Sequence, residues 1–176
     1  PSGIRCGSNL SRKEEGLSRL CDAMKITSYQ DNLKQSKRAE FSKLPDVLLL
    51  KAAKVAERFE HPDVHLVCVD ESIVNRTEFS INLPSNRRLA YVGDAFLALQ
   101  LAQQAFEKQL TPEDYQKWRG VCLSDKYLAR VYDELFPKDD VIVHFNDTLS
   151  VKQKATFIEA LVGLLKSDEL VKLIIK

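Results

Sequence analysis

One long apolar stretch constrains the fold of this 176-residue chain more than any other feature. Residues 86–108 contain no proline and a single glycine, and from Tyr91 to Phe106 apolar side chains fall on nearly every side of a helix. A helix of this kind is expected to be buried among other helices. The sequence therefore predicts an all-α, bundle-like domain with residues 86–108 at its centre.

Helix start signals divide the rest of the chain into further helices. Only six glycines and six prolines occur, and strand-like alternation is nearly absent. Predicted helices begin at Ser11, Pro45, Pro62, Thr111, Ser124, Ser150 and Ser167. Those opened by Ser11, Pro45, Pro62 and Ser150 are expected to end near Met24, Phe59, Val74 and Lys166. We therefore divide the chain into a polar N-terminal helical extension, residues 1–44, and one domain, residues 45–176.

Composition narrows the possible classes of protein. The 26 basic and 25 acidic residues give a net charge of +1, so any surface for nucleic acid must be a local patch. The four cysteines are widely spaced and form no zinc-binding pattern. No apolar run approaches the roughly 20 residues that span a bilayer, so no membrane association is expected. The chain begins at Pro1, which fits a fragment as well as a processed organelle protein.

Two carboxylates, Asp94 and Glu159, lie within otherwise apolar helical stretches. A buried carboxylate is costly unless a counter-charge, a hydrogen-bond donor or a metal compensates it. Two such residues on two core helices suggest one acidic cleft, and hard cations such as Mg²⁺ prefer oxygen ligands. A purely structural role is equally open, because Asp94 could accept bonds from Arg87 or Arg88 and Glu159 from a backbone amide.

Three segments resemble the ribonuclease III family. Residues 86–97, NRRLAYVGDAFL, are similar to the family's signature helix, usually N-E-R-L-E-F-L-G-D-A. Residues 123–129, LSDKYLA, resemble its L-V-S-N-x-x-L-A segment, and residues 155–163, ATFIEALVG, resemble its A-D-x-(L/F)-E-A helix. The family's T-H-R-S would fall on residues 69–72. Order and spacing agree over about residues 62–166, which implies a ribonuclease III-type helical fold.

The resemblance implies an activity and also casts doubt on it. The family cleaves double-stranded RNA with Mg²⁺ held by four carboxylates, two on each of two helices. Here Asp94 and Glu159 remain at these positions, but Ala90 and Thr156 replace the other two. Arg87 stands where the family has a further glutamate. We therefore expect no catalytic residues and no bound metal. If Mg²⁺ were bound, Asp94 and Glu159 would be its ligands. An alternative is that Asp70 or Glu71 supplies a substitute oxygen ligand.

The resemblance also implies partners. We expect a homodimer, or a heterodimer with another ribonuclease III-like subunit, and binding to structured or double-stranded RNA by shape and phosphate contacts. The candidate RNA-binding residues are Lys51, Lys54, Arg58, Arg87 and Arg88, with Lys34, Lys37 and Arg38 in the extension. The favoured function is a non-catalytic subunit of a ribonucleoprotein, such as the mitochondrial large ribosomal subunit or an RNA-processing or editing complex. The alternatives are a divergent Mg²⁺-dependent endoribonuclease and a helical interaction module unrelated to RNA.

Overall fold

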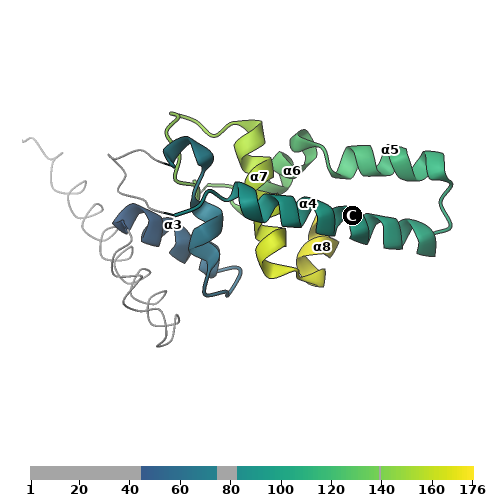
Figure 1. The fold of residues 1–176 in the computed structure, drawn as a ribbon, viewed down its shortest axis with the longest axis horizontal. Coiled ribbons are helices and arrows are strands. Elements are labelled where there is room, and N and C mark those ends of the chain that lie inside the picture. Colours follow the sequence, from purple (N-terminus) through teal and green to yellow (C-terminus); the bar gives the residue numbers. More distant parts are fainter. Residues whose placement is uncertain (1–44, 75–82, 139) are drawn as a thin grey trace, which may run out of the picture.

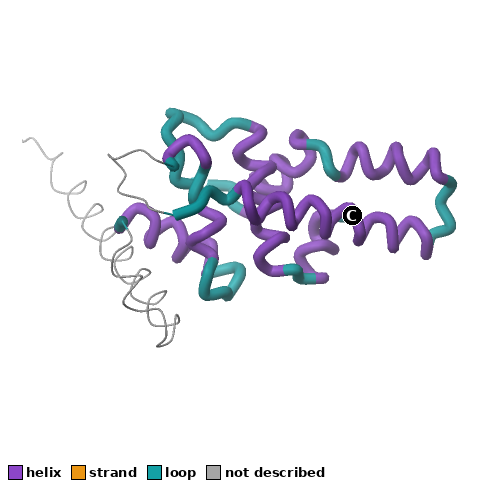
Figure 2. The backbone as a smooth tube through the Cα atoms, in the orientation of Figure 1, coloured by secondary structure: helices purple, strands orange, loops and turns teal. Residues whose placement is uncertain are grey.

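The computed structural model describes residues 45–74, 83–138 and 140–176 (Figures 1 and 2). These residues form six α-helices, two short 3-10 helices and no strand, so the predicted all-α class is confirmed for them. The α-helices are α3 (Asp46–Ala56), α4 (Arg87–Glu107), α5 (Pro112–Cys122), α6 (Asp125–Leu135), α7 (Val151–Leu165) and α8 (Asp168–Ile174). The 3-10 helices are η1 (Val64–Cys68) and η2 (Glu71–Ile73). The helix expected from Ser11 and the extension of residues 1–44 lie outside the described residues.

The predicted caps form where the sequence places them. The Thr111 and Ser124 hydroxyls accept the amide hydrogens of Asp114 and Tyr127, at 3.2 and 3.3 Å. Ser150 begins a complete capping box: its hydroxyl accepts the Gln153 amide at 3.1 Å, and the Gln153 side chain accepts the Ser150 amide at 2.9 Å. These bonds satisfy amides that the first helical turn leaves unpaired, which fixes where α5, α6 and α7 begin.

The single helix predicted over residues 62–74 is wrong. Two 3-10 turns replace it, because the backbone is extended at Val69 and Asp70 between them. There it pairs with the connector that follows α6: the Asp70 amide donates to the Val143 carbonyl at 3.1 Å, and the Val143 amide donates to the Cys68 carbonyl at 2.7 Å. The apolar run of residues 141–143 is therefore a buried partner of this segment, and that contact outweighs the local helical tendency.

The core lies where α7 crosses α4 and packs against α6. Its aromatic centre consists of Tyr132 and Phe136 from the α6 end and Phe157 of α7. The rings of Tyr132 and Phe157 meet edge to face with their centroids 5.3 Å apart, and Phe136 meets Phe157 in the same way at 5.6 Å. Leu48 and Val55 of α3 belong to the same buried cluster, so α3 packs against this core.

The expectation that α4 is buried on every side is wrong. Tyr91, Val92, Leu99 and Phe106 are 64, 43, 54 and 86% exposed. The helix is too long for the bundle: its second half and α5 form a hairpin that extends beyond the other described helices (Figure 1). Its buried residues, such as Leu97 and Leu101, occupy only one face. The opposite face is apolar but has no cover within the described chain.

Candidate functional site

The crossing of α4 and α7 brings the two predicted carboxylates into one region. Gly93 and Gly163 occupy the contact, and a Cβ atom added to either would lie 2.9 Å from the backbone nitrogen of the other. Asp94 follows Gly93, and Glu159 lies one turn before Gly163. This close approach explains why both sequence segments carry a glycine at that position.

Glu159 is the more perturbed of the two acids. Partial burial, with the nearby carboxylates of Asp94 and Asp125, raises its pKa to about 7, whereas Lys152 acts in the opposite direction. The negative charge of this region is therefore incompletely compensated by the protein. Asp125, in the first turn of α6, is a member of the cluster that sequence reasoning missed. Its only sequence signal was an acid at the asparagine position of the L-V-S-N segment.

Asp94 is exposed, so the prediction that it is buried and needs a counter-charge is wrong. The proposed pairing with Arg87 is also wrong, because the Arg87 guanidinium donates to Glu71 Oε2 at 2.8 Å and stacks near the Tyr91 ring. Among the described residues, Asp94 has no ion pair with Arg88 either. The exposed face of α4 is open to water, which solvates this carboxylate without a partner.

A polar pocket of about 430 Å³ lies beside this cluster, where α4 and α7 begin. Its lining includes Asp70, Asn86, Arg87, Lys152, Gln153 and Thr156. Asp70 is only 7% exposed, and its Oδ2 atom accepts hydrogen bonds from the Gln153 side chain at 3.0 Å and from the Ser72 amide at 2.9 Å. The pocket wall is therefore held by bonds between η2 and α7.

The comparisons with known proteins now identify the fold family. The model of the ribonuclease III domain matches residues 87–169, from the first residue of α4 into α8. This part of the chain belongs to the ribonuclease III domain family. No curated protein and no solved structure matches the chain.

At two of the four positions that the resemblance assigns to carboxylates, this sequence has Ala90 and Thr156, and the structure shows where these two residues lie. Ala90 is 4% exposed and packs in the core, so its methyl group occupies a closed position. Thr156 lines the polar pocket, one turn before Glu159 on α7. Asp94 and Glu159 remain at the other two positions.

The residues present do not fit the metal centre that the family implies. In the residues that the structure describes, no three His, Cys, Asp or Glu side chains lie close enough together to hold an ion. Neither suggested substitute completes such a group in the described residues: Asp70 Oδ2 accepts from Gln153, and Glu71 is paired with Arg87. We therefore derive no metal-dependent step for this ribonuclease III domain.

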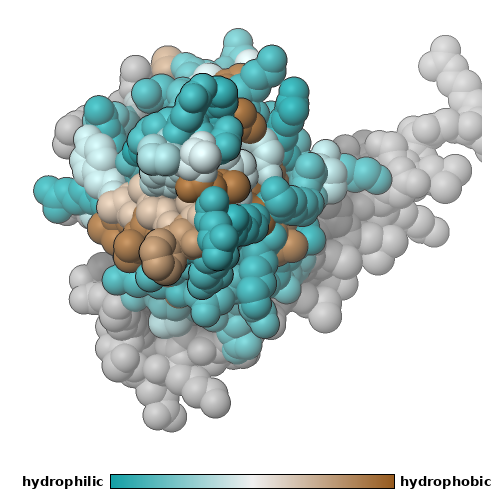
Figure 3. Space-filling view, turned by 90° about the vertical axis from the view of Figure 1, so that its right-hand side faces the viewer, coloured by the Kyte–Doolittle hydropathy of each residue, from teal (hydrophilic) through white to brown (hydrophobic). Residues whose placement is uncertain are grey.

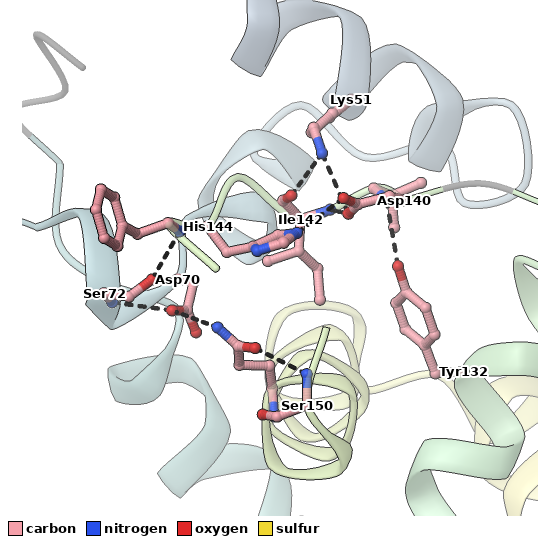
Figure 4. A network of polar contacts seen from close by, with 11 residues as sticks. Lys51, Asp70, Ser72, Tyr132, Asp140, Ile142, His144 and Ser150 are labelled. Atoms are coloured by element: carbon pink, nitrogen blue, oxygen red, sulfur yellow. Dashed lines mark hydrogen bonds and ion pairs between the residues drawn. The ribbon is translucent and has the colours of Figure 1, made fainter. Parts of the chain in front are cut away.

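The predicted RNA-binding cations of α3 and of the turn after it make contacts within the domain. Lys51 donates to the Ile142 carbonyl at 2.6 Å and pairs with Asp140 at 3.1 Å. Asp140 also pairs with His144, and the Tyr132 hydroxyl accepts the amide of Val141, so this network fastens the connector to α3 and α6 (Figure 4). Arg58 donates to the Leu135 carbonyl, and Lys54 also has an interaction partner. The RNA-binding role of these residues stays a prediction.

Two other cations are better placed for an external ligand. Arg88, which the sequence analysis proposed, is exposed at the start of α4 and forms no ion pair within the described chain. Lys152, which it missed, is exposed at the start of α7, lines the polar pocket and likewise forms no ion pair in the described ranges. None of the helices in those ranges has the length and apolar character that a bilayer crossing requires.

Proposed function

We propose that this protein is a non-catalytic ribonuclease III-like subunit that binds structured or double-stranded RNA and dimerises within a ribonucleoprotein. One observation carries the proposal: the carboxylate positions at 90 and 156 are now a buried methyl group and a pocket-lining hydroxyl. With half of the ligand set replaced, a hard divalent cation has too few oxygen ligands. The family fold supplies the relation to double-stranded RNA.

The exposed face of α4 supports dimerisation. Tyr91, Ala95, Leu99, Ala102 and Phe106 are all exposed and recur every three or four residues, so they form one apolar stripe. The view toward the end of the α4–α5 hairpin shows apolar side chains grouped among hydrophilic ones (Figure 3). Apolar surface of this extent usually marks an interface. A second copy, or a related subunit with an equivalent helix, is the partner we propose.

A mitochondrial location, in the large ribosomal subunit or in an RNA-processing or editing complex, is a further part of the proposal. It rests on analogy with non-catalytic members of the family rather than on a residue of this chain. Fractionation of cells that express the tagged full-length protein tests it, together with the RNA and proteins that copurify. Copurification of the tagged protein with cytosolic rather than mitochondrial markers would contradict this part alone.

One observation favours the alternative of a divergent Mg²⁺-dependent endoribonuclease. Burial and the neighbouring carboxylates of Asp94 and Asp125 raise the pKa of Glu159, so the negative charge of this region is only partly compensated. Incubation of the protein with perfect duplex RNA and Mg²⁺ or Mn²⁺ distinguishes the two functions. We expect binding without cleavage. Cleavage that an Asp94→Asn variant abolishes would establish the endoribonuclease instead.

A further inference from the structure

The polar pocket has the features of a preformed binding site. Its buried groups are fixed: Asp70 is bonded to Gln153 and Ser72, and the Asn86 side chain, 1% exposed, donates to the Val67 carbonyl at 3.1 Å. Figure 4 shows Ser72, Asp70 and Ser150 in this chain of bonds, in which the Gln153 side chain links Asp70 to Ser150. Because these bonds tie η1 and η2 to α4 and α7, a ligand would meet walls that need little ordering.

The charges in the pocket are separated in a way that suits one class of ligand. Glu71 is paired with Arg87, whereas the exposed Lys152 forms no ion pair among the described residues and interacts with Glu159 only at longer range. The Asp70 carboxylate forms no ion pair within these ranges, and both of its described bonds end on one oxygen, Oδ2. The pocket thus presents a positive charge at its edge and a negative group in its wall.

A ribonucleotide with an amino-bearing base has a group that can bind each charge of this pocket. A phosphate pairs with an exposed lysine, while carboxylate and carboxamide side chains are the groups that bind the exocyclic amines and ring nitrogens of bases. Unpaired RNA bases are recognised by such hydrogen bonds on their open edges. The hydroxyl of Thr156, which has no partner in the described residues, offers a further donor and acceptor inside the pocket.

We propose that this pocket holds one unpaired ribonucleotide of a bound RNA, with its amino-bearing base toward Asp70 and its phosphate toward Lys152. The inference rests on the proposed function, because it gives that RNA a specific feature. Lys152, Thr156 and Glu159 are spaced by four and three residues on α7, so the pocket opens beside the retained carboxylates. A duplex bound over this part of α7 would present an unpaired nucleotide next to the pocket.

The test compares two RNA duplexes that are identical except for one unpaired cytidine. We expect the full chain to bind the bulged duplex about tenfold more tightly, which corresponds to about 1.4 kcal/mol. Thr156→Val should remove most of this preference and leave binding of the perfect duplex within about threefold. Lys152→Ala should weaken binding of both duplexes, because it removes a phosphate contact, and should also remove most of the preference for the bulge. Lys172→Ala, which changes an exposed lysine on α8, is the matched control and should keep the preference.

A second measurement does not depend on duplex binding. Cytidine monophosphate should perturb the amide resonances of residues around Asp70 and Thr156, and it should bind at least about tenfold more tightly than inorganic phosphate. An equal affinity for phosphate would overturn the inference, because the base would then contribute nothing. Binding of the perfect duplex with no preference for the bulge would overturn it and leave the proposed function standing. Binding of the nucleotide at these residues, without any affinity for duplex RNA, would support the pocket and contradict the proposed function.

Discussion

A Cβ atom on Gly93 of α4 would overlap the carbonyl oxygen of Glu159 on α7, so these two helices touch backbone to backbone. Gly163 has the reciprocal relationship with the Leu89 carbonyl. Asp94 and Glu159 lie beside this helix contact, so the distance between the two carboxylates depends on how closely α4 and α7 approach. Any side chain between the helices would separate the two acids as well as weaken the core.

Gly93→Ala should therefore destabilise the protein although alanine favours a helix. The helical preference contributes about 1 kcal/mol, but overlap with rigid backbone in a packed core costs about 1–3 kcal/mol or more. We expect the free energy of unfolding to fall by about 2 kcal/mol. Gly120→Ala is the matched control: nothing lies within 4 Å of a Cβ there, and it should raise stability by about 0.5–1 kcal/mol. Urea unfolding followed by circular dichroism measures both, and equal stabilities would refute the close contact.

The raised pKa of Glu159 predicts that stability decreases as pH rises. Its pKa in the folded protein is about 7, above the ordinary value of 4.5. The folded state therefore binds this proton more tightly than the unfolded state, so stability falls as pH rises from about 4.5 toward 7. In metal-free buffer, Glu159→Gln should remove this part of the pH dependence. Thermal unfolding over that range measures it, and a variant that loses as much stability as the parent would contradict the raised pKa.

Asp94→Asn tests the origin of the Glu159 shift separately. It removes a neighbouring negative charge that raises the pKa of Glu159, so this pKa should move down toward its ordinary value. An NMR titration of the Glu159 side-chain carboxyl follows the change directly. An Asp133→Asn variant is the control, because Asp133 is not among the groups that shift Glu159. An unchanged titration in Asp94→Asn would contradict the contribution of Asp94 and leave burial and Asp125 as the causes of the raised pKa.

Local signals in the sequence predicted most of the helices but not the site. The caps at Thr111, Ser124 and Ser150 act within one turn, so neighbouring residues suffice to predict them. The interruption at Asp70 depends on pairing with Val143, far away in the chain, and no local pattern encodes it. Asp94 and Glu159 were predicted as a pair. Asp125 and the pocket were not predicted, because they too depend on contacts between segments far apart in the chain. Those depend on where three helices and a connector meet.

The apolar stripe of α4 predicts a dimer, and one charged residue placed in the stripe should weaken it. Leu99 is 54% exposed at the middle of the stripe, and Leu99→Lys would place a charge in any interface that covers it. We expect the dissociation constant of the dimer to rise by at least about 100-fold, or about 2.7 kcal/mol. Sedimentation velocity measures the change, with Leu173→Lys on α8, 46% exposed, as the control. A parent protein that stays monomeric at high concentration would contradict the proposed dimer.

Replacing Lys51 with methionine should lower stability, whereas replacing Lys152 with methionine should change RNA binding. The Lys51 ammonium group binds the Ile142 carbonyl and Asp140 with its side chain only 17% exposed, so Lys51→Met leaves two groups without their partner. Loss of a charged, partly buried hydrogen bond costs about 1–3 kcal/mol, and we expect this variant to unfold at a lower temperature.

Lys152 is exposed and forms no ion pair in the described residues, so Lys152→Met should leave the free energy of unfolding nearly unchanged. It should instead reduce the dependence of RNA affinity on salt concentration by about one phosphate contact. If Lys51→Met kept its stability and lost the salt dependence, α3 rather than α7 would provide the RNA-binding surface, as the sequence alone suggested.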